Sequence, residues 1–362
     1  EELIVDLQPL FDIPVVGLLF QLIDYMIQVL TRNGAVILAL AAPIALGSYC
    51  GFMNERSGVV NIGIEGMMIA SAFAGWFVAT VIVQAFPDQP RADLFFGASP
   101  ALVIGVLAAI ITGMLVSAVH AWLSITVKAD QIISGVVINI VALGVTGYLI
   151  IIISRTAPIS AGKFTPYTPP EFLTDLPVVG WVFNMFLNHG PITMSVIVFA
   201  ILLQVLLFRS RWGLRTRSVG EHPKAAETVG IDVIRLRYRN VILGGIFAGL
   251  AGAWLTLEFT NSFQAGMTTG RGFIALAALI FGRWMPLGAF GAALLFASAS
   301  SLSIALRTIP PTGQLGDILT LLPNQFWAAL PYLVTIVILA GAVGRSVAPA
   351  AVGKPYERES AS

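Results

Sequence analysis

Residues 209–239 read RSRWGLRTRSVGEHPKAAETVGIDVIRLRYR and interrupt an otherwise strongly apolar chain. They hold eight of its 20 Lys and Arg residues. Hydrophobic stretches long enough to cross a membrane lie on both sides of this segment. We therefore interpret 209–239 as a polar, partly helical loop on one membrane face, and as a docking surface for a partner.

The composition fixes the class of protein. The chain is 57% hydrophobic and 11% charged, with a mean hydropathy of +0.88, whereas soluble domains carry about 25% charged residues. The 35 glycines suit membrane helices that pack with their backbones close together. We predict an all-α integral membrane protein, and a soluble monomer is excluded.

About 20 consecutive apolar residues are needed for a helix to cross the hydrocarbon core. Two shorter apolar stretches, 15–30 and 272–282, are either tilted, re-entrant or interfacial, which gives eight to ten spans in total. The full-length candidates are 33–53, 60–83, 99–126, 131–154, 190–208, 240–260, 285–306 and 325–345.

The distribution of basic residues predicts the orientation, because cytoplasmic loops carry an excess of Lys and Arg. With 209–239 in the cytoplasm, fourteen basic residues fall inside and five outside. The inside set adds Arg56, Lys128, Arg283, Arg345, Lys354 and Arg358, and the outside set is Arg32, Arg91, Arg155, Lys163 and Arg307. This orientation requires 272–282 to cross the membrane completely or nearly so.

Three parts follow from these spans. Residues 1–32 form an N-terminal amphipathic or first transmembrane segment, 33–345 a single transmembrane domain, and 346–362 a cytoplasmic tail. The external loop 155–189 contains five prolines, which break helices and stiffen turns, so we expect a structured cap there. We expect no signal peptide, because no charged segment with a cleavage site precedes the spans.

A first polar interruption of the spans is 54–68, NERSGVVNIGIEGMM. Asn61 and Glu65 are four residues apart and share one helical face, beside Gly63. A carboxylate inside a span is costly and usually faces a cavity or a partner. Two interpretations stay open: Asn61 and Glu65 face a translocation path or its gate, or Glu65 satisfies a neighbouring backbone end.

A second interruption, 268–276 (TTGRGFIAL), lies in the opposite half of the chain. Matched interruptions in two halves favour an inverted repeat around a central path. Arg271 either binds substrate hydroxyls or pairs with Glu65 or Glu258. Phe273 is one of several aromatic residues that either stack on a planar ligand or pack between helices; the others are Phe73, Trp254 and Phe263.

Catalytic motifs are absent from the sequence. It has no G-x-x-x-x-G-K-[ST] phosphate-binding loop and no H-E-x-x-H metal motif, and no G-x-S-x-G nucleophile elbow. One cysteine, Cys50, allows no disulfide within the chain. We predict no enzymatic activity, no metal site and no cofactor in this chain, and no nucleic-acid partner.

Within 209–239, Pro223 suits the first turn of a helix, 224–228 is a good helical run, and Gly230 supplies a stop. This pattern predicts one short helix flanked by arginines. The arginines alone are also explained by anchoring of the spans or by contact with anionic lipid, although that leaves the helix without a role.

Three stretches resemble one family of transporters. Residues 220–231 (GEHPKAAETVGI) resemble the coupling-helix loop of ATP-binding-cassette (ABC) importer permeases. Residues 55–68 (ERSGVVNIGIEGMM) resemble a signature of the nucleoside and simple-sugar branch of the branched-chain-amino-acid-type permeases. Residues 270–277 (GRGFIALA), followed by FGRW at 281–284 and PLG at 286–288, are similar to a third stretch of that branch.

The resemblance implies about ten transmembrane helices in two pseudo-symmetric halves, with interrupted helices and a cytoplasmic coupling helix. It implies a second permease chain, often different, cytoplasmic ATPase domains that bind ATP and Mg, and an extracytoplasmic substrate-binding lipoprotein. The expected location is the bacterial inner membrane, with 209–239 and the C-terminus cytoplasmic. His222 and Met285 depart from the family, which often has Asn at both positions.

By the same resemblance, two sets of residues gain roles. Those expected beside the path or its gate are Asn61, Gly63, Glu65, Arg271 and Phe273. Those expected to contact the ATPase are Glu221, Lys224, Ala225, Ala226, Glu227, Thr228 and Gly230.

The substrate implied is a nucleoside, and a simple sugar such as ribose or galactose is the alternative. Two other classes of protein remain open. An ion-coupled secondary transporter needs membrane carboxylates as ion sites, for which Glu65 and Glu258 are few. A membrane scaffold or receptor predicts no ATPase partner.

Overall fold

The structure is a computed structural model, and every regular element among the residues that it describes is a helix, as the composition predicts. The residues it describes are 14–32, 34–88, 96–153, 160, 162–174, 176, 179–311, 313–323, 325–327, 329–330, 333, 336–337 and 346–357.

Among these residues, seven helices are long and apolar enough to cross a membrane. They confirm seven of the eight predicted full-length spans, and the eighth, 325–345, lies largely outside the described residues. The seven are α3 (Gly34–Glu55), α4 (Ile64–Ala85), α5 (Pro100–Ala121) with its continuation η2 (Trp122–Thr126), α6 (Gln131–Ile153), α9 (Pro191–Arg209), α12 (Val233–Ala253) with its continuation η3 (Trp254–Phe259), and α14 (Pro286–Thr308).

Shorter helices complete the described chain. The predicted short segment 272–282 is confirmed as α13 (Arg271–Phe281), whose 11 residues extend about 16 Å, roughly half of the hydrocarbon core. The predicted orientation, which needs this segment to cross or nearly cross, stays a prediction. The predicted apolar stretch 15–30 lies in α2 (Pro14–Arg32), whose apolar part is Gly17–Val29. The other short helices are α7 (Glu171–Thr174), α8 (Gly180–Leu187), α10 (Arg211–Glu221), α11 (Pro223–Thr228) and α15 (Gln314–Thr320).

The chain divides into two compact units. The first contains Glu1–Leu40, Thr168–Asn188 and Leu294–Gly344, and the second contains the remaining residues. Inside the first unit, Gly34 lies against the side chain of Met185, and the Tyr25 hydroxyl donates to the backbone oxygen of Ile309 at 2.9 Å. All of the candidate functional residues lie in the second unit.

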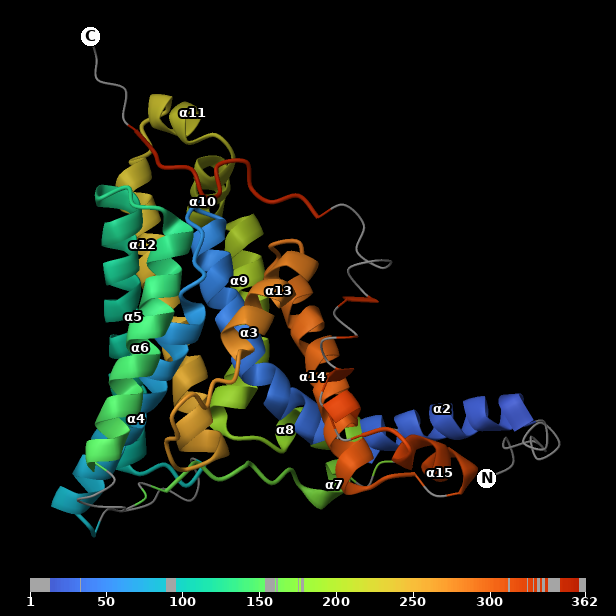
Figure 1. Cartoon of the computed structure of the whole chain (residues 1–362). Coiled ribbons are helices and arrows are strands. Elements are labelled where there is room, and N and C mark those ends of the chain that lie inside the picture. Colours follow the sequence, from blue (N-terminus) through green and yellow to red (C-terminus); the bar gives the residue numbers. More distant parts are fainter. Residues whose placement is uncertain are drawn as a thin grey trace. The chain divides into compact units, whose positions relative to one another are not determined.

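Glycines bring the central helices of the second unit together. Helices α4, α5 and α12 pack against one another, and α6 covers α4 (Figure 1). A Cβ at Gly113 of α5 would lie 2.3 Å from the backbone oxygen of Gly245 in α12, and one at Gly249 would lie 2.6 Å from the Cα of Ile110. The close backbone packing that the glycine content predicts is therefore present between α5 and α12.

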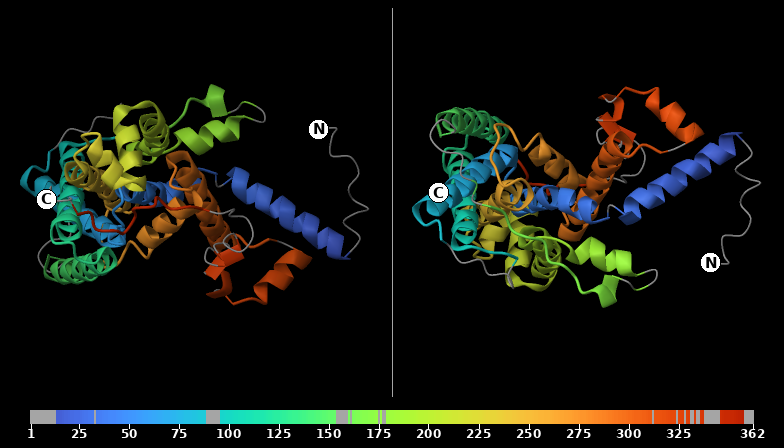
Figure 2. Two further views of the ribbon diagram at one scale, coloured as in Figure 1. Left: turned by 90° about the horizontal axis from the view of Figure 1, so that it is seen from above. Right: turned by 90° about the horizontal axis from the view of Figure 1, so that it is seen from below.

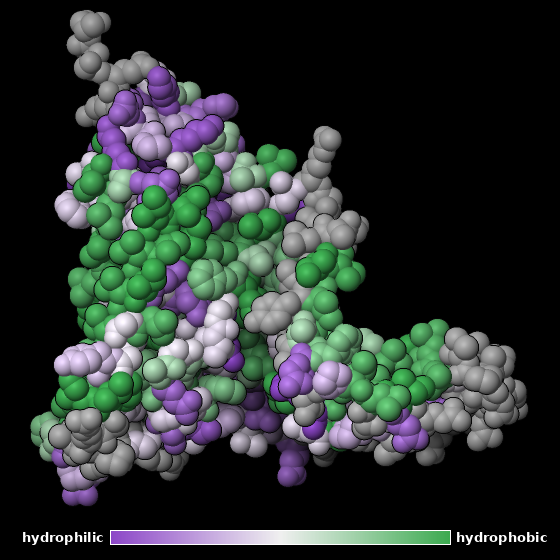
Figure 3. Space-filling model, in the orientation of Figure 1, coloured by the Kyte–Doolittle hydropathy of each residue, from purple (hydrophilic) through white to green (hydrophobic). Residues whose placement is uncertain are grey.

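The outer face of this unit is apolar. Aliphatic side chains of α5 and α6 are exposed, and Figure 3 shows them as a hydrophobic face, with hydrophilic residues gathered at the end that carries α11. Examples are Leu107, Ile111, Leu115, Ile133, Ile140 and Val141. Because water does not favour such a face and lipid does, the chain is a multi-pass membrane protein.

The segment 209–239 is more helical than predicted. It contains α10 as well as the expected α11, and α12 begins at Val233 rather than near residue 240. Two side chains set these boundaries: Ser210 accepts the amide of Gly213 at 3.0 Å, and Asp232 accepts that of Arg235 at 3.0 Å. Both are N-caps, which satisfy donors at the start of a helix. The prediction of a single short helix missed α10, whose apolar positions are few.

The tail lies at the same end of this unit. Residues 346–357 run beside α10 and α11 in Figure 1 and cross the ends of the helices in the view from above in Figure 2. Because the tail and α11 pack together, both belong to one membrane face.

Candidate functional site

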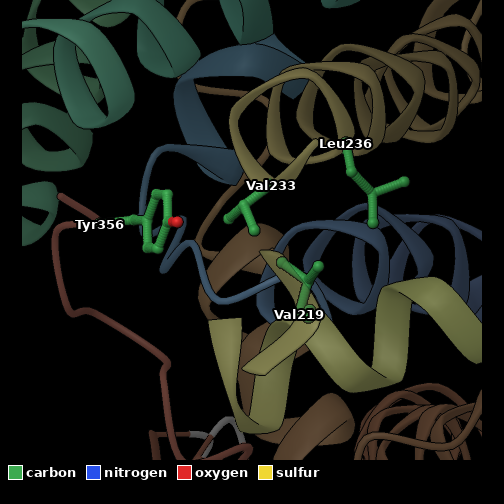
Figure 4. Packing of buried hydrophobic residues seen from close by; sticks show 5 residues of the cluster. Val219, Val233, Leu236 and Tyr356 are labelled. Carbon is green, nitrogen blue, oxygen red and sulfur yellow. The ribbon is translucent and has the colours of Figure 1, made fainter. Parts of the chain in front are cut away.

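The first candidate site is the surface of α10 and α11. A small hydrophobic cluster holds α11 on the start of α12: Val219, Ala226, Val233, Leu236 and Tyr356 are all buried (Figure 4). Trp212 and Ile231 pack against its edge. Helix α11 has only six residues, too few to be stable alone, so its position depends on this cluster.

The residues predicted to contact an ATPase are not equivalent in the structure. Glu221, Lys224, Ala225, Thr228 and Gly230 are exposed, and Glu227 is half-buried. Ala226 is only 3% exposed and points into the cluster instead.

Gly230 ends α11 as its sequence position predicts. Its φ of +81° is left-handed, a conformation in which glycine is free of strain. Its amide donates to the backbone oxygen of Glu227 at 2.8 Å.

The tail contributes residues that no sequence pattern identified. The Ala351 amide donates to the backbone oxygen of Gly220 at 2.9 Å, and the Ala350 amide donates to Glu221 Oε2 at 3.2 Å. The Tyr356 hydroxyl hydrogen-bonds to Glu227 Oε2. These pairs are about 130 residues apart in the chain, and no local pattern marks such a contact.

The second candidate site is the junction of the two interrupted segments. Glu65, in the first turn of α4, accepts the amides of Gly270 at 2.8 Å and Gly272 at 2.6 Å. These donors begin α13, where amides lack partners within the helix and the helix dipole favours a negative charge. The structure thus joins 54–68 to 268–276, and Glu65 satisfies a neighbouring backbone end, the second of its two open interpretations.

Asn61 and Gly63 hold the start of α4. Asn61 is fully buried, and its Oδ1 accepts the Gly63 amide at 2.9 Å. A Cβ at Gly63 would lie 3.3 Å from the Cα of Gly135 in α6. Asn139 of α6 completes the junction by accepting the Gly66 amide at 2.7 Å.

Arg271 bonds to the turn that precedes α13. Its Nη1 donates to the backbone oxygen of Met267 at 3.1 Å and to Thr269 Oγ1 at 2.7 Å. Glu65 is occupied by the α13 amides, and Glu258 accepts the amides of Ile192 at 2.7 Å and Thr193 at 3.1 Å. Both carboxylates therefore cap helix starts, Glu65 on α13 and Glu258 on α9.

Of the four aromatic residues considered for ligand stacking, three are buried. Phe73 and Phe263 pack edge to face, with ring centroids 5.2 Å apart, and Trp254 stacks on Phe259 at 4.8 Å. Phe273 is 49% exposed, so it is the one of the four whose side chain is open to its surroundings.

A third contact links the first interruption to residues 281–284. Trp284 Nε1 donates to Glu55 Oε2 at 2.5 Å, and Arg56 Nε donates to the backbone oxygen of Trp284 at 2.8 Å. Burial lowers the pKa of Arg56, and Glu221 nearby partly offsets this effect. A Cβ at Gly220 would lie 2.3 Å from the backbone oxygen of Arg56, so α10 directly abuts this contact.

The Glu65 junction makes a testable prediction. We expect Glu65→Ala to destabilise the protein by about 2–5 kcal/mol, because two amides lose their acceptor and each unsatisfied buried donor costs about 1–3 kcal/mol. Glu65→Gln keeps one acceptor oxygen and should lie between. Thermal unfolding in mild detergent measures the order. Glu171→Ala, at an exposed carboxylate, is the control, and an unchanged midpoint for Glu65→Ala would contradict the capping role.

Comparison with known proteins extends these observations. Residues 34–339 match the family described as branched-chain amino acid transport system / permease component. The guanosine ABC transporter permease protein NupQ of Bacillus subtilis is 40% identical over 91% of this chain and 98% of its own. The nucleoside ABC transporter permease protein NupC of Lactococcus lactis is 34% identical over 91% and 97%.

A third relative is named for a different substrate. The putative glucose ABC transporter permease protein TsgC13 of Haloferax volcanii is 36% identical over 91% of this chain and 96% of its own. No solved structure matches the chain. The family match spans most of the sequence and includes all three stretches described above, and the chain therefore belongs to the permease components of the branched-chain amino acid transport system family.

Proposed function

We propose that this chain is the transmembrane permease subunit of an ABC importer that takes up nucleosides, with energy from a separate ATPase. The main support for a nucleoside as the substrate is the similarity to NupQ, with 40% identity over nearly the full length of both chains. The absence of a phosphate-binding loop in the sequence agrees with ATP and Mg binding to a partner.

The proposed machine follows the family. The partner ATPase docks on α10 and α11 through Glu221, Lys224, Ala225, Glu227, Thr228 and Gly230, and Ala226 anchors this helix. Each permease subunit has about ten helices, this chain and a second, different permease chain enclose one path, and an extracytoplasmic lipoprotein delivers the ligand. The location is the bacterial inner membrane, with α11 and the tail on the cytoplasmic side.

The geometry supports a mechanical route from the docking surface to the membrane interior. Gly220 abuts Arg56, Arg56 holds Trp284, and Glu65 holds the start of α13. Movement of α11 by an ATPase is thereby transmitted to α4 and α13 together, because these contacts are short and each involves a backbone group.

Within this mechanism, the residues of the junction have different parts. Asn61, Gly63 and Glu65 hold the break before α4 and the start of α13 in fixed geometry. Arg271 braces the turn that precedes α13, and Phe273, which is half-exposed, is the side chain that meets the path. We propose that these residues together form the gate of the importer.

A simple sugar is the second candidate substrate. The putative glucose permease of Haloferax volcanii is 36% identical to this chain, a level similar to that of the nucleoside relatives. The substrate class therefore requires a direct competition experiment.

Uptake of radiolabelled guanosine tests the proposed function. We expect deletion of the gene to abolish uptake, and excess adenosine or uridine, but neither ribose nor galactose, to compete in cells that carry it. Uptake that a protonophore abolishes while ATP is preserved would instead indicate an ion-coupled transporter. Competition by sugars alone would move the substrate to that class, and no deficit for any solute would contradict the transport function.

A further inference from the structure

The C-terminal strap, defined here as residues 346–357, binds six separate elements. It contacts α10, α11, α12 and α13, the loop after α3, and the loop before α6. The contacts to α10 and α11 are the bonds to Gly220, Glu221 and Glu227 described above. In addition, the Gly353 amide donates to the backbone oxygen of Gly58 at 3.3 Å.

Arg237 of α12 anchors the strap. It is 1% exposed, and its Nη1 donates to the backbone oxygen of Lys354 at 3.1 Å. Its guanidinium carbon lies 5.9 Å from the centroid of the Tyr356 ring, within the range of a cation–π interaction. Its Nε and Nη2 have no hydrogen-bond partner among the described residues, so the strap supplies much of the compensation for burying this charge.

The strap reaches α11 from the side that faces the molecule. Tyr356 packs in the cluster with Ala226 while its hydroxyl holds Glu227. The outward residues Lys224 and Ala225 stay exposed. They line a groove of about 990 Å³ whose other wall is the strap, at Ala350, Lys354 and Tyr356.

We propose that the strap positions α11 for its partner, with Tyr356 and Arg237 as positioning residues. This inference rests on the proposed function, in which an ATPase moves α11. A six-residue helix that is held only by its two chain ends tilts easily. Ala226 packs α11 against the start of α12, and Glu227 holds Tyr356, whose ring lies against Arg237 of α12. Helix α11 therefore moves together with α12.

Tyr356→Phe tests the proposal, because it removes the hydroxyl that holds Glu227 and keeps the ring against Arg237. In the purified chain, we expect hydrogen exchange of the amides of 224–230 to rise about fivefold, the effect of one net hydrogen bond. In proteoliposomes with the ATPase, we expect fewer nucleosides transported per ATP hydrolysed. Deletion of 346–362 should enlarge both effects.

Further variants separate positioning from general damage. Lys128→Gln breaks the exposed 2.8 Å ion pair with Glu357 at the end of the strap and should change neither measurement, since such exposed pairs contribute little. Because Glu227 is also a proposed ATPase contact, its variants are compared only by hydrogen exchange of the purified chain. Glu227→Gln keeps an oxygen that accepts from Tyr356 and should leave exchange in α11 at the wild-type rate, whereas Glu227→Ala should raise it as Tyr356→Phe does. The double variant Tyr356→Phe/Glu227→Ala should show no faster exchange in α11 than either single variant, because both remove the same bond.

The outcomes are distinguishable from failure of the proposed function. Unchanged exchange in α11 after Tyr356→Phe and after deletion of the strap overturns the proposal. Faster exchange with an unchanged ratio of transport to ATP hydrolysis also overturns it. If the wild-type complex shows no ATP-driven nucleoside uptake while exchange still rises in Tyr356→Phe, the strap holds α11 as proposed, and only the proposed function fails.

Discussion

Ala226→Arg should abolish transport while the transmembrane helices remain folded. Ala226 is 3% exposed and packs among Val219, Val233 and Leu236. An arginine has no room there, and its charge has no partner in the cluster. Helix α11 must leave its site, but the displacement stays local because α11 adds six residues at the edge of the unit.

Two measurements check this expectation. Uptake of the labelled nucleoside should fall by at least about tenfold, which corresponds to 1.4 kcal/mol, and the helical circular dichroism of the purified chain should persist. Ala225→Arg places the same charge on the exposed neighbour and serves as the control for folding, with hydrogen exchange of α11 unchanged. Normal uptake by Ala226→Arg would refute the importance of α11.

Gly245→Val should prevent the membrane fold itself. A Cβ at Gly245 would lie 2.5 Å from the backbone oxygen of Gly113, and the reverse contact is 2.3 Å. Because both obstacles are backbone, α5 and α12 must separate, and contacts between small residues are the main attraction between helices in lipid. We expect a loss of about 3–5 kcal/mol or more.

The yield of monodisperse protein in mild detergent measures the loss. Gly144→Val is the matched control, because Gly144 is an exposed glycine in a spanning helix and a Cβ there meets no atom within 4 Å. Equal yields of the two variants would contradict the close packing of α5 on α12.

The spans were predictable because the bilayer sets their length. Seven predicted segments became helices with ends within a few residues, except α12, which begins earlier at Val233. Gly230 was predictable for a similar reason: a helix end that needs a left-handed residue selects glycine. In contrast, α10 was missed, because its 11 residues include three arginines and few apolar side chains, and its place on α9 arises from packing.

The polar residues were identified more easily than their partners. Glu65 was identified from the sequence as unusual, because a carboxylate in a span is costly. The sequence does not show whether that carboxylate binds a guanidinium, a substrate or a backbone amide. Glu258 lies in η3, a π-helical end of α12 without a sequence signal, and its partners are 65 and 66 residues away. Tyr356 and Arg237 carried no signal at all.

The sequence by itself determined that this is an all-helical membrane protein, where most spans lie, and which family it belongs to. These properties depend on local apolar length and on motifs that are continuous in the chain. Only the tertiary structure decided that Glu65 caps α13, that Ala226 points inward and that the tail holds α11. Each of these is a contact between segments far apart in the sequence, and such contacts are selected by the packing of whole helices rather than by the residues next to them.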